Sequence, residues 1–295
     1  PVLGVAGLLL CPLPLAVFGC LAGQRRMSMA ELMIELTLFI IISPSMAVYF
    51  LVGCAPVSAI IYFVSREDVK EIKKFSGPES LLICAGTSIV FKIILIAGFY
   101  FFTGQNIFFP DSAQMAAVMQ ELYGDNPELL QAAAQIVAVF PYLMPTLLTV
   151  YVGFEVLFNY YLCGRYVKKI SHKAKSFPPS LPEFKTWRFP KSLLVVGVAS
   201  FAISFFLDSD TWFDGAVFLM NLEIIINVFM FIQGLALIFW VMEGFKLKRL
   251  TKFFIFLILM IPFFWAWLIV IGMSDMILNL RERIKFKEND NNEQS

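Results

Sequence analysis

Long apolar stretches alternate with short polar gaps along the whole chain of 295 residues. A bilayer core about 30 Å thick needs roughly 20 apolar residues of helix to cross it, and most of the stretches approach that length. The pattern predicts an all-α protein, a polytopic transmembrane helical bundle of about eight spans. The predicted spans are Val2–Gly23, Ala30–Ile42, Met46–Val64, Leu81–Phe102, Ile136–Cys163, Leu193–Leu207, Ala216–Met242 and Phe253–Ile277.

The gaps between these stretches alternate in charge. Cytoplasmic loops of membrane proteins are rich in Lys and Arg, so the basic gaps are predicted to lie inside the cell. The two remaining gaps, Gly104–Gln135 and Asp208–Gly215, carry acidic residues and no basic ones, and are predicted to lie outside. The basic gaps are Gln24–Ser28, Ser65–Gly77, Arg165–Lys191 and Glu243–Lys252. This arrangement is typical of a multi-pass membrane protein whose basic loops lie in the cytoplasm.

The end of the chain departs from this alternation. Arg281 and three further basic residues follow the eighth stretch directly. Eight full spans would leave them outside, whereas a re-entrant hairpin broken at Pro262 would return them inside. Because Phe253–Ile261 is too short to cross a membrane alone, we expect a full span and an outer basic tail. We assign 1–287 to one transmembrane domain and expect the polar tail, 288–295, to be disordered.

The outer gap Gly104–Gln135 is long enough for helices of its own, and we treat 105–135 as an outer helical insertion. Apolar residues recur at helical spacing after Pro110, and Asn126-Pro127 is typical of a second helix start. An amphipathic lid on the outer surface is one interpretation, and a helix that merely packs over the bundle is the other. The basic cytoplasmic loop 165–191 contains four prolines, among them Pro178, Pro179 and Pro182, and is predicted to be irregular.

Composition supports membrane insertion and excludes several classes of protein. The chain is 59% hydrophobic, with a mean hydropathy of +0.77, which is more apolar than soluble domains are. The net charge of +1 gives no support for nucleic-acid binding. The five cysteines form no CxxC pair and there is one histidine, His172, so no metal or cofactor is expected. An acidic loop with Asp208, Asp210 and Asp214 is interpreted as solvated rather than metal-binding.

Catalytic motifs are absent from the sequence. No GxxxxGK[ST], HExxH, GxSxG or GxGxxG pattern occurs. An enzyme is therefore the function that the sequence supports least.

Polar side chains inside the apolar stretches are the candidates for a functional site, because each charge costs about 2.5–3.5 kcal/mol at a helix centre. Lys92 is the only Lys or Arg deep in a predicted span. Counting residues from the outer ends at ~1.5 Å per residue places Glu223 at a similar depth and Glu155 nearer the inner half. We therefore expect Lys92 to pair with Glu223 before Glu155.

Two more polar residues lie on the same predicted span as Glu223. Asn227 follows it by four residues, on the same helix face, and Gln233 lies further along. Together with Lys92, these residues could form a polar binding site or an ion relay. The structural alternatives are a buried ion pair that fixes helix register and interhelical hydrogen bonds.

Four short motifs resemble a known family. They are Pro12-Leu13-Pro14-Leu15 ahead of Gly23, Trp187-Arg188-Phe189-Pro190, Gln233-Gly234-Leu235-Ala236, and Gly272-Met273-Ser274-Asp275 followed by Arg281. In their order and placement they resemble the YybS-like family of bacterial membrane proteins, a domain of unknown function. That family is distantly similar to the substrate-binding subunits of energy-coupling-factor vitamin transporters and to MreD. The resemblance implies a compact helical bundle in a bacterial inner membrane and transfers no activity.

Two functions fit these observations. The first is a non-enzymatic integral membrane protein that serves as a subunit or scaffold of a larger assembly, with other membrane proteins or a second copy as partners. The alternative is a small-molecule binding or transport protein like the vitamin-transporter subunits, with Lys92 binding a small anionic ligand beneath the outer lid. In both cases the lipid bilayer is the solvent.

Overall fold

The computed structural model describes residues 9–66, 75–104, 120–121, 127–170, 176–204 and 213–284. Regular secondary structure within these ranges is entirely helical. The contacts divide the chain into two compact units, Pro1–Leu181 and Pro182–Ser295, where the sequence predicts one transmembrane domain. The predicted lid helix after Pro110 lies outside the described residues apart from Gln120 and Glu121, and so does the tail 288–295.

Four helices are long and apolar enough to cross a membrane, or five if a bent pair near the end of the described chain is one span. The first, second and sixth predicted spans yield shorter helices among the described residues. The chain is therefore a membrane-embedded all-helical protein, and the prediction of eight spans is not confirmed. The four long helices are Met46–Ser65, Gly77–Phe102, Tyr142–Ile170 and Gly215–Gly244.

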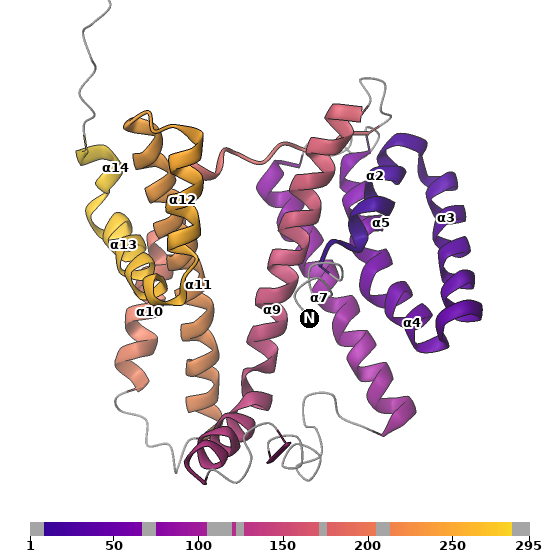
Figure 1. Cartoon of the computed structure of the whole chain (residues 1–295), viewed down its shortest axis with the longest axis horizontal. Helices are drawn as coiled ribbons and strands as arrows, with labels where there is room; N and C mark the ends of the chain where they lie inside the picture. Colours follow the sequence, from indigo (N-terminus) through magenta and orange to yellow (C-terminus); the bar gives the residue numbers. More distant parts are fainter. Residues whose placement is uncertain are drawn as a thin grey trace, which may run out of the picture. The chain divides into compact units, whose positions relative to one another are not determined.

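Four helices of the first unit pack into a closed ring. Helix α2 contacts α5 and α9, and α7 contacts the same two helices (Figure 1). Small and β-branched side chains, among them Ala16, Val57 and Val152, are fully buried between them. The helices of this unit are α2 (Pro12–Ala22), α3 (Gln24–Thr37), η1 (Leu38–Ile42), α4 (Pro44–Tyr49), η2 (Phe50–Cys54), α5 (Ala55–Ser65), α7 (Gly77–Thr103) and α9 (Pro127–Ile170).

The breaks between these helices follow from local sequence. Helix α2 begins at Pro12 and ends at Gly23, whose φ of 90° belongs to a region that L-residues rarely adopt. Ser43 caps α4, since its Oγ accepts a hydrogen bond from the Met46 amide at 3.2 Å. Ser76 and Glu79 form a reciprocal capping box at the start of α7. Proline, glycine and capping residues thus set the boundaries of these helices.

Three of the predicted cytoplasmic gaps meet at one end of the first unit. Arg66 Nη1 donates to Gln24 Oε1 at 3.0 Å, which joins the first basic gap to the second. Gly77 lies directly against the backbone of Ser180 and Leu181, which joins the second gap to the third. The alternating charges of the sequence thus correspond to a shared end of the helix bundle.

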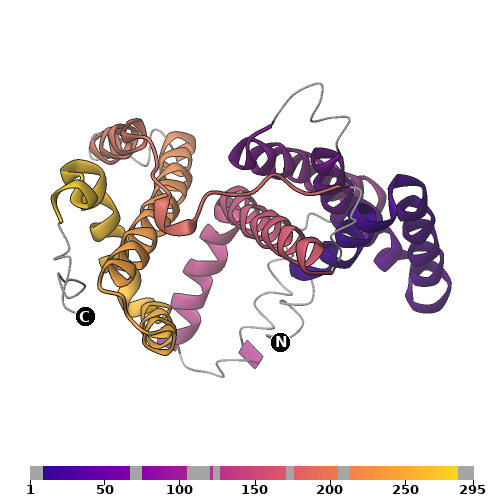
Figure 2. The same ribbon diagram turned by 90° about the horizontal axis from the view of Figure 1, so that it is seen from above.

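The second unit is built on a close crossing of two helices, α11 and α13 (Figure 2). A Cβ atom on Gly234 would overlap the carbonyl oxygen of Leu268, and one on Gly272 would overlap that of Met230. The two glycines therefore let the helix backbones touch. The helices of this unit are η3 (Phe184–Thr186), α10 (Lys191–Ser204), α11 (Phe213–Gly244), α12 (Arg249–Leu259), η4 (Pro262–Phe264), α13 (Trp265–Leu278) and α14 (Leu280–Arg283).

Helices α12 and α13 form the bent pair, with an angle of 85° at the break before Pro262. The end of α13 returns to the end of α11 from which α12 departs. Arg281 Nη1 donates to the Lys185 carbonyl at 2.6 Å, and Lys185 Nζ lies 2.6 Å from a Glu243 carboxylate oxygen at the end of α11. This geometry favours the re-entrant alternative over the full span and outer tail expected from the sequence. The chain bends by 85° at this break, where Pro262 cannot continue the preceding helix.

The returning hairpin predicts that residue 283 lies on the same membrane side as residue 246. We expect Arg283→Cys and Lys246→Cys, each in a cysteine-free background, to react with a membrane-impermeant maleimide only after cells are permeabilised. Glu121→Cys, in the predicted outer gap, is the matched control and should react in intact cells. Labelling of Arg283→Cys in intact cells would contradict the hairpin and support a full last span with an outer tail.

The helix crossing predicts a strong dependence on two glycines. Gly234→Ala and Gly272→Ala should each lower the stability of the protein in detergent by about 1–3 kcal/mol, because the added methyl meets backbone that cannot rotate away. Gly153→Ala is the control, since no heavy atom lies within 4 Å of its Cβ position. Thermal unfolding that is equal for all three variants would contradict the close crossing.

Candidate functional site

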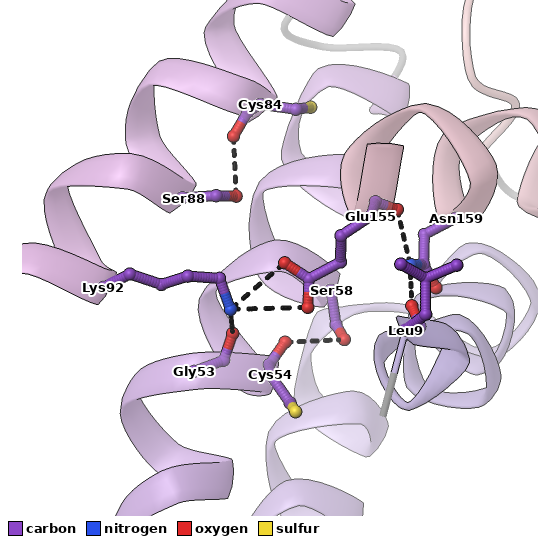
Figure 3. A network of polar contacts seen from close by, with 9 residues as sticks. All are labelled: Leu9, Gly53, Cys54, Ser58, Cys84, Ser88, Lys92, Glu155 and Asn159. Atoms are coloured by element: carbon purple, nitrogen blue, oxygen red, sulfur yellow. Dashed lines mark hydrogen bonds and ion pairs between the residues drawn. The ribbon is translucent and has the colours of Figure 1, made fainter. Parts of the chain in front are cut away.

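Lys92 lies at the centre of a buried polar network in the first unit (Figure 3). It projects from α7, and its side chain is 7% exposed. Its ammonium lies 3.1 Å from Glu155 Oε2 on α9, and it donates hydrogen bonds to Glu155 Oε1 at 3.4 Å and to the Gly53 carbonyl at 3.3 Å. It also lies 5.5 Å from the centre of the Tyr151 ring. One side chain therefore ties α7 to both α9 and η2.

The Gly53 carbonyl is presented by an unusual stretch of helix. Residues Phe50–Cys54 form a π-helical turn, which is rare and is frequent at functional sites. Directly beyond it, the Ser58 hydroxyl donates to the carbonyl of Pro12 at 2.8 Å and to that of Cys54 at 3.3 Å. The widened turn is thus tied to α2 on one side and to Lys92 on the other.

Asn159 extends the network by one turn of α9. Its amide nitrogen donates to the Glu155 carbonyl at 2.6 Å and to the Leu9 carbonyl at 2.7 Å (Figure 3). The side chain is fully buried, and its Oδ1 has no hydrogen-bond partner among the described residues. The sequence analysis missed Asn159, although its place four residues after Glu155 puts both on one helix face.

The expected order of partners for Lys92 was wrong, because the structure pairs it with Glu155 rather than with Glu223. The fifth predicted span ends at Cys163, but the corresponding helix α9 continues to Ile170. Lys92 lies 15 residues after Gly77 and Glu155 lies 15 residues before Ile170 (92 − 77 and 170 − 155). At ~1.5 Å per residue both lie about 22 Å from the ends that carry the basic gaps. The two charges therefore meet at the same height.

The remaining candidates, Glu223, Asn227 and Gln233, all lie on α11 in the second unit. Asn227 is exposed, and Glu223 is half-buried with one carboxylate oxygen that has no hydrogen-bond partner among the described residues. Gln233 is fully buried and belongs to a second network. A role for any of these residues in binding stays a prediction.

The second network joins three of the short motifs seen in the sequence. The Phe189 amide donates to Gln233 Oε1 at 3.0 Å, and Gln233 Nε2 donates to Asp275 Oδ2 at 2.6 Å. The same Asp275 oxygen lies 3.2 Å from Nε of Arg281. Asp275 and Arg281 side chains are both 3% exposed. Neither was named as a site residue from sequence, although Asp275 is a carboxylate within the eighth predicted span and such a residue is a usable signal.

At its edge this network reaches the surface through Lys185. The Lys185 ammonium donates to the carboxylates of Glu183 and Glu243, and these hydrogen bonds raise the pKa of Lys185 above its ordinary value. Nearby, Arg188 and Glu282 form an exposed pair at 3.1 Å. These surface contacts lie beside the C-terminal ends of α11 and α13.

Each network contains a buried pair of opposite charges, Lys92 with Glu155 and Arg281 with Asp275, and the two charges of each pair compensate each other. No group of three or more His, Cys, Asp or Glu side chains among the described residues could hold a metal ion. The acidic loop with Asp208 and Asp210 lies outside the described residues. A groove in the first unit is lined by Phe91 and Thr87 of α7, and Lys92 is not among its lining residues.

Apolar helices long enough to span a bilayer, with buried charge pairs between them, define an integral membrane protein of the helical class. Within that class, residues 1–276 match the family described as Predicted membrane protein (DUF2232), and the chain belongs to it. No curated protein and no solved structure matches the chain.

The buried ion pair predicts a characteristic pattern of stability. Lys92→Met and Glu155→Gln should each destabilise the folded protein by about 3–5 kcal/mol, because each leaves one buried partner uncompensated. The double variant should recover most of this loss, since it removes both groups. Unfolding in mixed micelles measures all three variants against the parent protein.

Glu282→Gln is the matched control for this cycle. It breaks the exposed pair with Arg188 and should change stability by no more than about 1 kcal/mol. A double Lys92→Met/Glu155→Gln variant that loses the sum of the two single losses would show that the two side chains do not interact.

Proposed function

We propose that this protein is a non-enzymatic subunit or scaffold of a larger assembly in the bacterial cytoplasmic membrane. The observation that carries the proposal is that both buried ion pairs are completed within the chain. Lys92 is compensated by Glu155, and Arg281 by Asp275. A side chain whose charge is already paired in a packed bundle is better suited to fixing helices than to capturing a ligand.

A broad apolar surface on the first unit supports contact with other helices. Helix α3 buries only Met27, and the adjoining η1 buries no residue at all. From Met29 onward most of their exposed side chains are large and apolar, among them Leu32, Met33, Leu36, Phe39 and Ile40. Lipid can cover such a face, and so can the helices of a partner, which gain van der Waals packing in the membrane.

The alternative is a small-molecule binding or transport protein resembling a vitamin-transporter substrate-binding subunit. Its support is the groove of about 480 Å³ in the first unit, a size typical of ligand sites. In this alternative the ligand does not reach Lys92, so the ligand-binding role first considered for that residue moves to other side chains.

The scaffold proposal predicts a stable complex in the native membrane. After extraction with a mild detergent, the protein should migrate in native gels as an assembly larger than its own micelle. A photo-activated crosslinking residue at Phe39 or Ile40 should join it to a protein partner, whereas one at buried Val57 should not.

One result tests the scaffold proposal, and a second tests the role of the ion pair within it. If the protein migrates alone and Phe39 crosslinks only to lipid, the scaffold proposal is wrong. If the assembly forms and a folded Lys92→Met/Glu155→Gln variant still enters it, the ion pair acts through structure alone.

A further inference from the structure

A groove runs between α3, η2, α5 and α7 of the first unit. Its volume is about 480 Å³, and most of its wall is apolar, formed by residues such as Leu51, Ala55, Ile60 and Phe91. Two charged side chains of opposite sign also line it, Glu31 on α3 and Arg66 at the end of α5. An apolar trough with both charges at its wall is chemically suited to an amphiphile.

The negative side of the groove is a pair of carboxylates one helical turn apart. Glu31 lines the groove, and Glu35 lies on the same face of α3. Neither has a cationic partner among the described residues, and Glu35 Oε1 is buried without a hydrogen bond. All other described residues of α3 beyond Met27 are uncharged.

At the depth of these carboxylates, a negative charge without a cationic partner is energetically unfavourable. They lie 7 and 11 residues after Gln24, the first residue of α3 (31 − 24 and 35 − 24). At ~1.5 Å per residue this is about 10 and 16 Å from the end that carries Arg25 and Arg26. An acidic side chain at such depth in apolar surroundings usually has a partner. The groove beside it is the space from which a positive group can approach.

The positive side of the groove lies at its basic end. Arg66 Nη1 donates to Gln24 Oε1 at 3.0 Å, so the guanidinium is held at the groove wall beside an amide. Guanidinium groups favour phosphate, because their planar N–H donors match its oxygens. Arg66 and Glu31 therefore present opposite charges at the wall of one groove, which is the charge pattern that the phosphate and ammonium of a zwitterionic headgroup match.

We propose that the groove binds an aminophospholipid of the surrounding leaflet. Its ammonium group lies against Glu31, with Glu35 behind, and its phosphate faces Arg66. An acyl chain follows the apolar wall formed by Ala55, Ala59 and Phe91. This lipid supplies a cation that the two carboxylates lack among the described residues, and it fills the groove that those residues line.

The proposal can be tested with lipids of defined headgroup. The full-length protein is placed in nanodiscs with equal amounts of phosphatidylethanolamine and phosphatidylglycerol, released, and examined by native mass spectrometry. We expect retained phosphatidylethanolamine to exceed phosphatidylglycerol at least fivefold, and Glu31→Gln to remove that preference. Glu282→Gln, an exposed carboxylate elsewhere, is the control and should keep it.

A second variant tests the groove itself and guards against misfolding. Ala59 is exposed on the groove wall, so Ala59→Trp should fill the space and remove the retained lipid while the melting temperature stays close to that of the parent. Equal retention of the two lipids by the parent protein, or an unchanged preference in Glu31→Gln, would overturn the proposal. Retention of phosphatidylglycerol alone would overturn it as well.

Discussion

The first unit depends on one interaction, the ion pair between Lys92 and Glu155. Each charge would be unfavourable in a lipid-facing helix, and each is stabilised only where α7, α9 and η2 come together. The pair therefore penalises every arrangement of these helices that separates it. Helix packing in lipid lacks a strong hydrophobic drive, so such a polar contact specifies which helices are neighbours and at what height.

In the second unit, close backbone packing and a buried polar network determine which helices are neighbours. Gly234 and Gly272 bring two backbones into contact, and one turn away Gln233 and Asp275 join the same helices by a hydrogen bond. Arg281 then compensates Asp275 and fastens the end of α13 to the Lys185 carbonyl. Close packing and buried charge act on the same helix pair. Three of the four motifs that resembled a membrane protein family in sequence thus meet in this network, and the contacts explain why these residue types occur there.

Sequence alone predicted the class of fold and the clustering of basic gaps at one end of the helices. These depend on the lengths of the apolar stretches and on loop charge. It failed on the partner of Lys92, because that contact depends on where α9 ends, and the helix continues past the apolar stretch to Ile170. It also favoured a full last span, because the local sequence around Pro262 does not show the contact between Arg281 and Lys185, which are 96 residues apart in the chain.

The central claim is that Lys92 and Glu155, two buried charges of the first unit, compensate each other. Solid-state nuclear magnetic resonance on the protein in lipid bilayers tests it directly, through the dipolar coupling between the Nζ of Lys92 and the carboxylate carbon of Glu155. The account predicts a strong coupling, as expected for an N···O separation of 3.1 Å, that disappears in Glu155→Gln labelled in the same way. A Lys92 ammonium that shows no coupling to Glu155 and couples instead to Glu223 would contradict the account.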